Sequence, residues 1–135
     1  MQSTVTWISD MEFDSTTSSG HIIKLDAAED VGGHDKGPRP KELLLNGLGG
    51  CTGMDVIAIL RKMKSLPDHF RVEITSELTE EHPRIFKTIK MKYIFSGNID
   101  QEKIIKAVGL SQEKYCGVTA ILKESAELTY EIVYE

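Results

Sequence analysis

Short stretches of alternating hydrophobic and polar residues occupy the N-terminal third of the chain. This alternation at residues 5–8, 11–13 and 21–25 predicts three short strands. A polar break at residues 14–20 separates the last two, and the glycine-bearing segment 27–37 follows the third. The chain is therefore predicted to begin with β-structure and to continue through a loop.

The pattern then changes to that of a helix without a polar face. We expect this helix to begin near Pro40, whose fixed φ suits the first helical position, and to run to about Lys64, before Pro67. A helix that is apolar on every side belongs in a core or an interface, and a single small sheet cannot cover it all. Part of its surface should therefore meet a second copy of the chain, which predicts a homodimer. Asp55 would be costly in a bilayer, so a buried helix is favoured over a membrane span.

Two strands and two helices are predicted next. Residues 70–74 and 85–95 alternate and are joined by the polar segment 79–84, which indicates an antiparallel hairpin. Asp100 can cap a short helix that ends at Gly109, and Ser111 can cap a second helix over residues 112–123.

The C-terminal residues 126–134 alternate again and predict a last strand with one buried face. The predicted order is β-β-β-α-β-β-α-α-β. With 135 residues, this is an α+β fold in a single domain, residues 1–135.

Composition and motifs exclude several functions. The net charge of −5 and the scattered lysines leave no basic face for nucleic acid. The first twenty residues lack the basic start and apolar run of a secretory signal, so we expect a cytoplasmic protein. There is no Ser-His-Asp elbow, phosphate loop or dinucleotide fingerprint. The four histidines share no metal-like spacing with each other or with the cysteines, and no metal site is predicted.

Two cysteines remain as candidates for chemistry. Cys51 lies among four glycines in the long helix, where each glycine costs about 1 kcal/mol relative to alanine. The glycines either let a backbone, a partner side chain or a substrate approach the thiol, or they allow tight packing around a small buried cysteine. Cys116 is expected near a helix start, where free N–H groups favour a thiolate, although it too can be a buried structural residue. The pair is more informative than either member, because an oxidised thiolate needs a nearby thiol to escape over-oxidation.

Asp55 stands one helical turn after Cys51 and, as an unpaired carboxylate, would oppose thiolate formation. A cation near Cys51 should offset the negative charge of this carboxylate. The cations on the helix or at its start are Arg39, Lys41, Arg61 and Lys62.

Several motifs resemble those of the OsmC/Ohr family, the osmotically inducible and organic hydroperoxide resistance proteins. They are GPRPKELLL at residues 37–45, GGCT at 49–52 followed by Asp55-Val56, and YCGV at 115–118. The resemblance implies an intertwined homodimer whose long central helices are buried against each other, with active sites at the interface. It also implies that the Cys51 thiolate attacks a hydroperoxide and becomes a sulfenic acid, with which Cys116 condenses to a disulfide. An external dithiol such as dihydrolipoamide would reduce that disulfide, and no bound cofactor is expected.

The chain departs from the family pattern at two charges. His21 stands where the family's peroxidases have an arginine that stabilises the thiolate, and Lys41 stands where they have the glutamate that pairs with it. Arg39 and Glu42 are therefore predicted to support Cys51 instead, or Lys41 supplies the charge. The alternative for Arg39 and Glu42 is that they only cap the helix start.

The predicted function is thiol-dependent reduction of organic hydroperoxides in oxidative stress defence. Two alternatives stay open on the same fold, a module that binds a small hydrophobic ligand and a redox sensor. A wide separation of Cys51 and Cys116 would argue against the two-cysteine cycle, because a disulfide requires close approach of the two residues.

Overall fold

The computed structural model describes residues 1–135, which form two compact units, Met1–Leu45 and Asn46–Glu135. Strands and helices follow one another largely in the predicted order, so the predicted α+β class is confirmed. The assignment of residues 1–135 to one domain stays a prediction.

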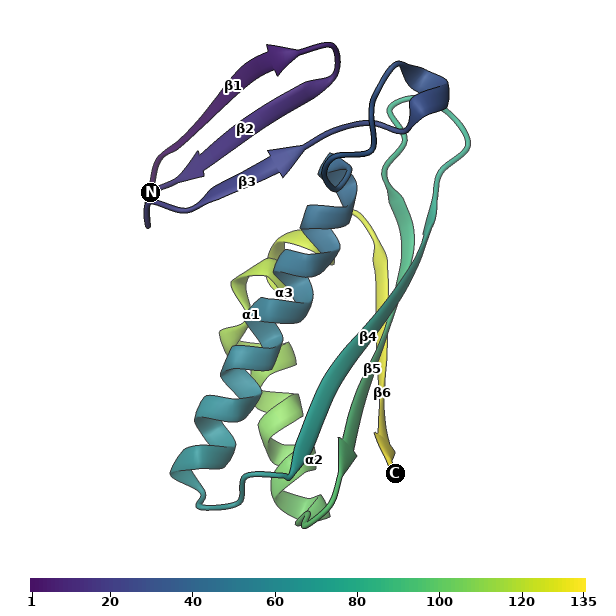
Figure 1. Ribbon diagram of the computed structural model, residues 1–135. Helices are drawn as coiled ribbons and strands as arrows, with labels where there is room; N and C mark the ends of the chain where they lie inside the picture. The colour runs from purple at the N-terminus through teal and green to yellow at the C-terminus, as the bar shows by residue number, and fades with distance from the viewer. The chain divides into compact units, whose positions relative to one another are not determined.

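The N-terminal unit is built on an antiparallel sheet of β1 (Ser3–Ser9), β2 (Glu12–Thr17) and β3 (Ile22–Leu25), followed by the 3-10 turn η1 (Glu29–Val31) (Figure 1). The predicted break at residues 14–20 is wrong in its first half, because β2 continues to Thr17. β2 is the central strand, and Asp14 pairs with Thr6 on one side and Lys24 on the other. Pairing on both edges thus outweighs the polar character of the segment.

This small sheet leaves much of its apolar surface uncovered. Every residue of β1 is exposed, and Trp7 retains 64% of its surface. The other large exposed apolar side chains of the unit's sheet and turns are Val5, Ile8, Met11, Ile22, Ile23 and Val31. Exposed apolar area of this extent is typical of a surface that meets another protein.

Asp26 organises the loop after β3. Its buried carboxylate accepts hydrogen bonds from the backbone N–H groups of Ala27 (2.7 Å), His34 (3.1 Å) and Lys36 (3.2 Å). Burial alone would raise the pKa of Asp26, but the three backbone donors outweigh burial and hold the pKa below its ordinary value. The charged carboxylate therefore anchors the loop that leads to the long helix.

The C-terminal unit has a second sheet of β4 (His69–Leu78), β5 (Phe86–Ser96) and β6 (Glu127–Tyr134). The predicted hairpin of β4 and β5 is confirmed, and β6 joins in parallel on the other side of β5. The long helix α1 (Pro40–Lys62) enters this unit at Asn46 and lies with α2 (Gln101–Leu110) and α3 (Gly117–Leu122) on one face of the sheet (Figure 1).

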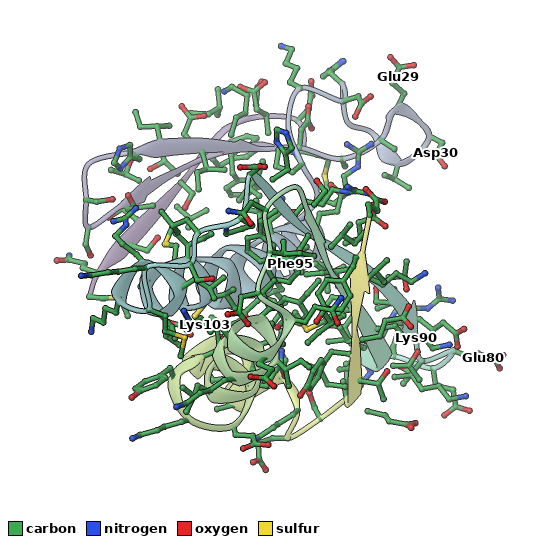
Figure 2. All side chains as sticks on the ribbon, turned by 90° about the horizontal axis from the view of Figure 1, so that it is seen from below. Glu29, Asp30, Glu80, Lys90, Phe95 and Lys103 are labelled. Carbon is green, nitrogen blue, oxygen red and sulfur yellow. The ribbon has the colours of Figure 1, made fainter.

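The core lies between these helices and β5. Alternate β5 side chains point toward the helices, and Figure 2 shows Phe95 in this interior while Lys90 and Glu80 project outward. The large core side chains are Leu48, Val56, Leu60, Ile89, Met91, Tyr93, Phe95, Ile104 and Val108. At about 1.5–3 kcal/mol for each fully buried large apolar side chain, this layer supplies most of the driving force for folding of the unit.

Only one stripe of α1 is buried within the chain, at Leu48, Thr52, Val56 and Leu60. By length and composition α1 could cross a membrane, since an 18-residue window has a mean hydropathy of 1.6, and 22% of that window is buried. A core helix of a soluble protein passes the same test. Because one sheet covers one side of α1, the opposite side stays uncovered, and Met54 is 76% exposed there.

The C-terminal helices differ from the prediction. Gly109 does not end α2, and the chain continues through the π-helical turn η2 (Ser111–Tyr115), after which Cys116 is the N-cap of α3. Ser111 is therefore not an N-cap but a buried helical residue. The reason is the buried stripe of Ile104, Ala107 and Val108, which Ser111 extends at helical spacing into the core.

Candidate active site

The fold brings Cys51, Asp55 and Cys116 together in the C-terminal unit. The two Sγ atoms and a carboxylate oxygen of Asp55 all lie within 4.8 Å of one another. Both cysteines are free thiols, Cys51 partly exposed and Cys116 buried at 4% exposure. A reagent can therefore reach the Cys51 thiol directly, and the Cys116 thiol lies next to it.

The packing of α1 fixes the direction of the Cys51 and Asp55 side chains. Thr52 and Val56 are fully buried, and Cys51 and Asp55 immediately precede them on the helix. Cys51 and Asp55 are one helical turn apart and share the edge of the buried stripe, where both are half-buried. Helix geometry alone therefore places the carboxylate beside the thiol.

Cys116 is positioned by the π-helical turn. Its backbone N–H donates to Ser111 O at 2.8 Å, and its own conformation is extended, with φ −73° and ψ 101°. The change from helical to extended backbone at Cys116 turns its side chain back, so that Sγ accepts a hydrogen bond from the N–H of Thr119 at 3.3 Å. π-Helical turns of this kind often occur at functional sites.

Burial is the largest influence on the Cys116 thiol and raises its pKa. Thr119, through its side chain and backbone N–H, acts in the opposite direction, and the nearby Cys51 raises the pKa further. Of the two interpretations of Cys116 from the sequence, the raised pKa favours the buried cysteine over a thiolate activated by the helix start, because loss of water outweighs the N–H donor. A thiol that stays protonated at neutral pH suits a resolving residue better than an attacking one.

A chain of buried hydrogen bonds ends on Asp55. Ser111 Oγ donates to Asp55 Oδ2 (3.0 Å), and Thr52 Oγ1 lies 2.7 Å from both Ser111 Oγ and Tyr93 OH. An ionised carboxylate can only accept, and each hydroxyl has one proton to give. Ser111 must then accept from Thr52, and Thr52 from Tyr93, whose oxygen accepts from the Gln112 amide. With an ionised Asp55, all the protons of this chain therefore point toward its carboxylate.

Arg39 and Glu42 belong to the N-terminal unit and make their hydrogen bonds there. Glu42 Oε2 accepts from the backbone N–H of Arg39 at 2.9 Å, which closes the first turn of α1 as in a capping box. The Arg39 guanidinium donates to Asp35 Oδ1 (2.5 Å) and Gly37 O (3.1 Å). The capping alternative is therefore seen directly, while a role for either side chain toward Cys51 stays a prediction. His21 Nδ1 contacts Ser19 Oγ in its own turn at 2.8 Å.

Sequence reasoning missed most of the polar groups around the thiols. It treated Asp55 only as a charge to be offset, although its helical spacing from Cys51 already placed it on the same face. Ser111, Tyr93 and Gln112 lie on other elements, and no local pattern relates them to Cys51. It predicted the thiol pair, but it did not recognise the two thiols and the carboxylate as a group of possible metal ligands, because they have no signature spacing.

The fold and the site together define an α+β protein in which a thiol on a long glycine-bearing helix lies next to a thiol at the start of a short one. A family model described as OsmC-like protein matches residues 33–131, and the chain belongs to this family.

Three known proteins illustrate the relationship. Protein YhfA of Escherichia coli (strain K12) is 37% identical over 98% of each chain. A hypothetical protein from Aquifex aeolicus VF5 is 33% identical, with a TM-score of 0.82 over 99% of this chain and 96% of that one. An organic hydroperoxide resistance protein OsmC from Legionella pneumophila is 13% identical, with a TM-score of 0.72 over 98% of this chain and 97% of that one. At that identity the likeness shows the fold alone.

Proposed function

We propose that this protein reduces organic hydroperoxides with a two-cysteine cycle and contributes to defence against oxidative stress. The observation that carries the proposal is the approach of the Cys51 and Cys116 sulfurs to within 4.8 Å, with Cys51 the more exposed of the two. Membership of the OsmC-like family and the fold shared with the Legionella hydroperoxide resistance protein support the same activity.

The cycle needs a hydroperoxide and an external dithiol. The Cys51 thiolate attacks the terminal peroxide oxygen, the O–O bond breaks, and the leaving alkoxide takes a proton to form an alcohol. The resulting Cys51 sulfenic acid condenses with the Cys116 thiol to form a disulfide and release water. A dithiol such as dihydrolipoamide then reduces the disulfide by thiol exchange and is itself oxidised. Disulfide bonds are about 2.05 Å long, so the sulfurs must approach further in the condensation step.

Thiolate formation at Cys51 requires a positive charge near its sulfur. Asp55 is an acceptor of hydrogen bonds from Ser111 and adds negative charge beside the sulfur. A cation is needed to offset it, and we propose Arg39, with Glu42 orienting the helix start, or Lys41 for this role. Replacing Arg39, Glu42 and Lys41 one at a time tests which of them is needed for thiolate formation at Cys51.

A homodimer is part of the proposal. The uncovered side of α1 carries Met54 and Ala58 together with Gly47 and Gly50, where an added Cβ would meet nothing within 4 Å. The chain's own packing therefore does not require glycine at these two positions. Gly49 is different, because its Cβ would lie 3.2 Å from Ile74 Cδ1. Glycines that face outward allow a second helix to approach closely, and a second copy of α1 is the occupant that fits.

The decisive experiment measures consumption of cumene hydroperoxide and tert-butyl hydroperoxide with dihydrolipoamide as the reductant. Wild-type protein should turn over many times, whereas Cys51→Ser should be inactive. Cys116→Ser should complete one turnover and accumulate sulfinic and sulfonic Cys51, detected by mass spectrometry. The exposed carboxylate variant Glu102→Gln serves as a matched control and should retain full activity.

Activity that is unchanged in Cys51→Ser would overturn the proposal. Wild-type protein that forms no intramolecular disulfide after one equivalent of hydroperoxide would remove Cys116 from the cycle. Native mass spectrometry of protein purified from cells tests the alternative of a ligand-binding module, because a retained small hydrophobic molecule together with no turnover would favour it.

A further inference from the structure

We propose that the reduced protein binds a zinc ion through Cys51 Sγ, Cys116 Sγ and one carboxylate oxygen of Asp55, with the fourth position open to water. This site uses the same side chains as the proposed cycle but does not depend on it, because metal binding requires only the dithiol state. The proposal rests on geometry, on the surrounding hydrogen bonds and on charge.

The geometry is close to that of a tetrahedral zinc site. The three ligand atoms lie within 4.8 Å of one another. With Zn–S bonds of about 2.3 Å and tetrahedral angles, two sulfurs bound to one ion lie about 3.8 Å apart. The atoms therefore need to move by no more than about 1 Å toward a common centre, which side-chain rotation can supply. Three protein ligands and an open fourth position are typical of zinc sites that exchange ligands.

The hydrogen-bond chain provides the outer shell that such a site needs. Metal-bound carboxylates are usually oriented by a second hydrogen bond. Here Ser111 Oγ donates to Asp55 Oδ2, and Thr52 and Tyr93 hold Ser111 in place behind it. Asp55 Oδ1 makes no hydrogen bond and is free to bind an ion.

The turn that carries Cys116 offers a second, independent indication. The N–H of Thr119 donates to Cys116 Sγ at 3.3 Å, a contact that stabilises a metal-bound thiolate. The hydroxyl oxygen of Thr119 is buried and makes no hydrogen bond of good geometry, although it lies near enough to Cys116 to lower the pKa of that thiol. Buried hydroxyl groups are rarely left unpaired, and this one lies one helical turn after Cys116, where it can donate to a thiolate or to metal-bound water.

The charge and softness of the ligands select the type of ion. Two thiolates and a carboxylate carry three negative charges, and their mutual repulsion in a half-buried site disfavours the ionised state without a cation. Thiolate ligands prefer zinc and other soft ions over magnesium or calcium. Asp55, which opposes thiolate formation in the peroxidase cycle, is a suitable ligand in this site.

Zinc and hydroperoxide would compete for Cys51. A bound ion occupies both sulfurs and prevents sulfenic acid formation, while the Cys51–Cys116 disulfide has no thiolate to offer and cannot hold the metal. Oxidation of the pair therefore releases zinc, and zinc protects the reduced pair. The thiols release two protons when they bind the ion.

The test is titration of reduced wild-type protein with Co²⁺ as a spectroscopic probe, followed by displacement with Zn²⁺. We expect one ion per chain, a sulfur-to-cobalt charge-transfer band and visible bands typical of tetrahedral cobalt. Cys51→Ser and Cys116→Ser should lose the charge-transfer intensity, and Asp55→Asn and Ser111→Ala should weaken Zn²⁺ binding about 10- to 100-fold. Glu102→Gln, an exposed carboxylate on α2, is the matched control and should bind as the wild type does.

Wild-type protein oxidised to the disulfide should bind no Co²⁺, which gives a test that does not depend on the folding of any variant. Absence of the charge-transfer band in reduced wild type would overturn the proposal, as would a band of equal strength after oxidation. If Asp55→Asn binds Zn²⁺ with the affinity of wild type, the carboxylate is not a ligand of the ion. These measurements contain no peroxide, so their failure is distinguishable from failure of the peroxidase cycle.

Discussion

Ser111 Oγ donates a hydrogen bond to Asp55 Oδ2 across 3.0 Å and thereby ties the segment that leads to Cys116 to the helix that carries Cys51. The same hydroxyl lies 2.7 Å from Thr52 Oγ1. The relative position of the two thiols therefore depends on a buried polar contact as well as on apolar packing.

Replacement of Ser111 tests this connection. Ser111→Ala leaves the Thr52 hydroxyl without an acceptor and Asp55 without its donor, so we expect the free energy of unfolding to fall by about 1–3 kcal/mol in urea titrations. Ser125→Ala is the matched control, because its exposed hydroxyl makes only a 3.4 Å contact with Leu122 O, and it should change stability by less than about 0.5 kcal/mol. Equal effects of the two substitutions would contradict the buried role of Ser111.

The raised pKa of Tyr93 predicts that the protein loses stability at alkaline pH. Burial raises the pKa of the Tyr93 hydroxyl, which Thr52 and Gln112 only partly oppose. Above about pH 10 the unfolded chain loses this proton while the folded chain keeps it, so stability is complete below pH 10 and falls as pH rises further. Urea titrations between pH 9 and pH 11 should show this decline. Tyr93→Phe should be less stable than wild type at pH 8 and should lose less stability over the alkaline range.

The lowered pKa of Asp26 predicts that the protein loses stability as the pH falls into the acidic range. Because its pKa is lowered in the folded state, its contribution to stability is complete above the ordinary aspartate pKa of about 4 and is lost as pH falls through the folded pKa. Asp26→Asn should therefore melt several degrees below wild type at pH 7. The difference in melting temperature between Asp26→Asn and wild type should narrow below pH 4. Glu29→Gln, an exposed change in the same loop, should show no such convergence.

Met54 tests the proposed dimer. A glutamate on the exposed side of α1 would bury a charge in the interface if a second α1 covers it. We expect wild-type protein to sediment as a dimer and Met54→Glu to sediment as a monomer or as a weaker, concentration-dependent dimer. Ile105→Glu, at an exposed apolar position of α2, adds the same single negative charge and is the control. A monomeric wild type at micromolar concentration would exclude the dimer.

The sequence by itself determined most of the secondary structure. Alternation of apolar residues along β4, β5 and β6 and the cap at Asp100 are local signals, and the structure contains these elements with small shifts at their ends. The sequence also determined the family, through motifs around Cys51 and Cys116, and the adjacency of Cys51 and Asp55, which follows from helix periodicity. These features depend on residues a few positions apart, where backbone geometry is predictable.

Only the tertiary structure decided how the site is assembled. Ser111 looks like a helix cap in the sequence but is a buried residue of a π-helical turn, because its hydroxyl finds Thr52 and Asp55 in the core. The thiol of Cys116 looks activated at a helix start, yet burial raises its pKa. Burial and contacts between distant segments arise from packing of the whole unit, and no local pattern encodes them.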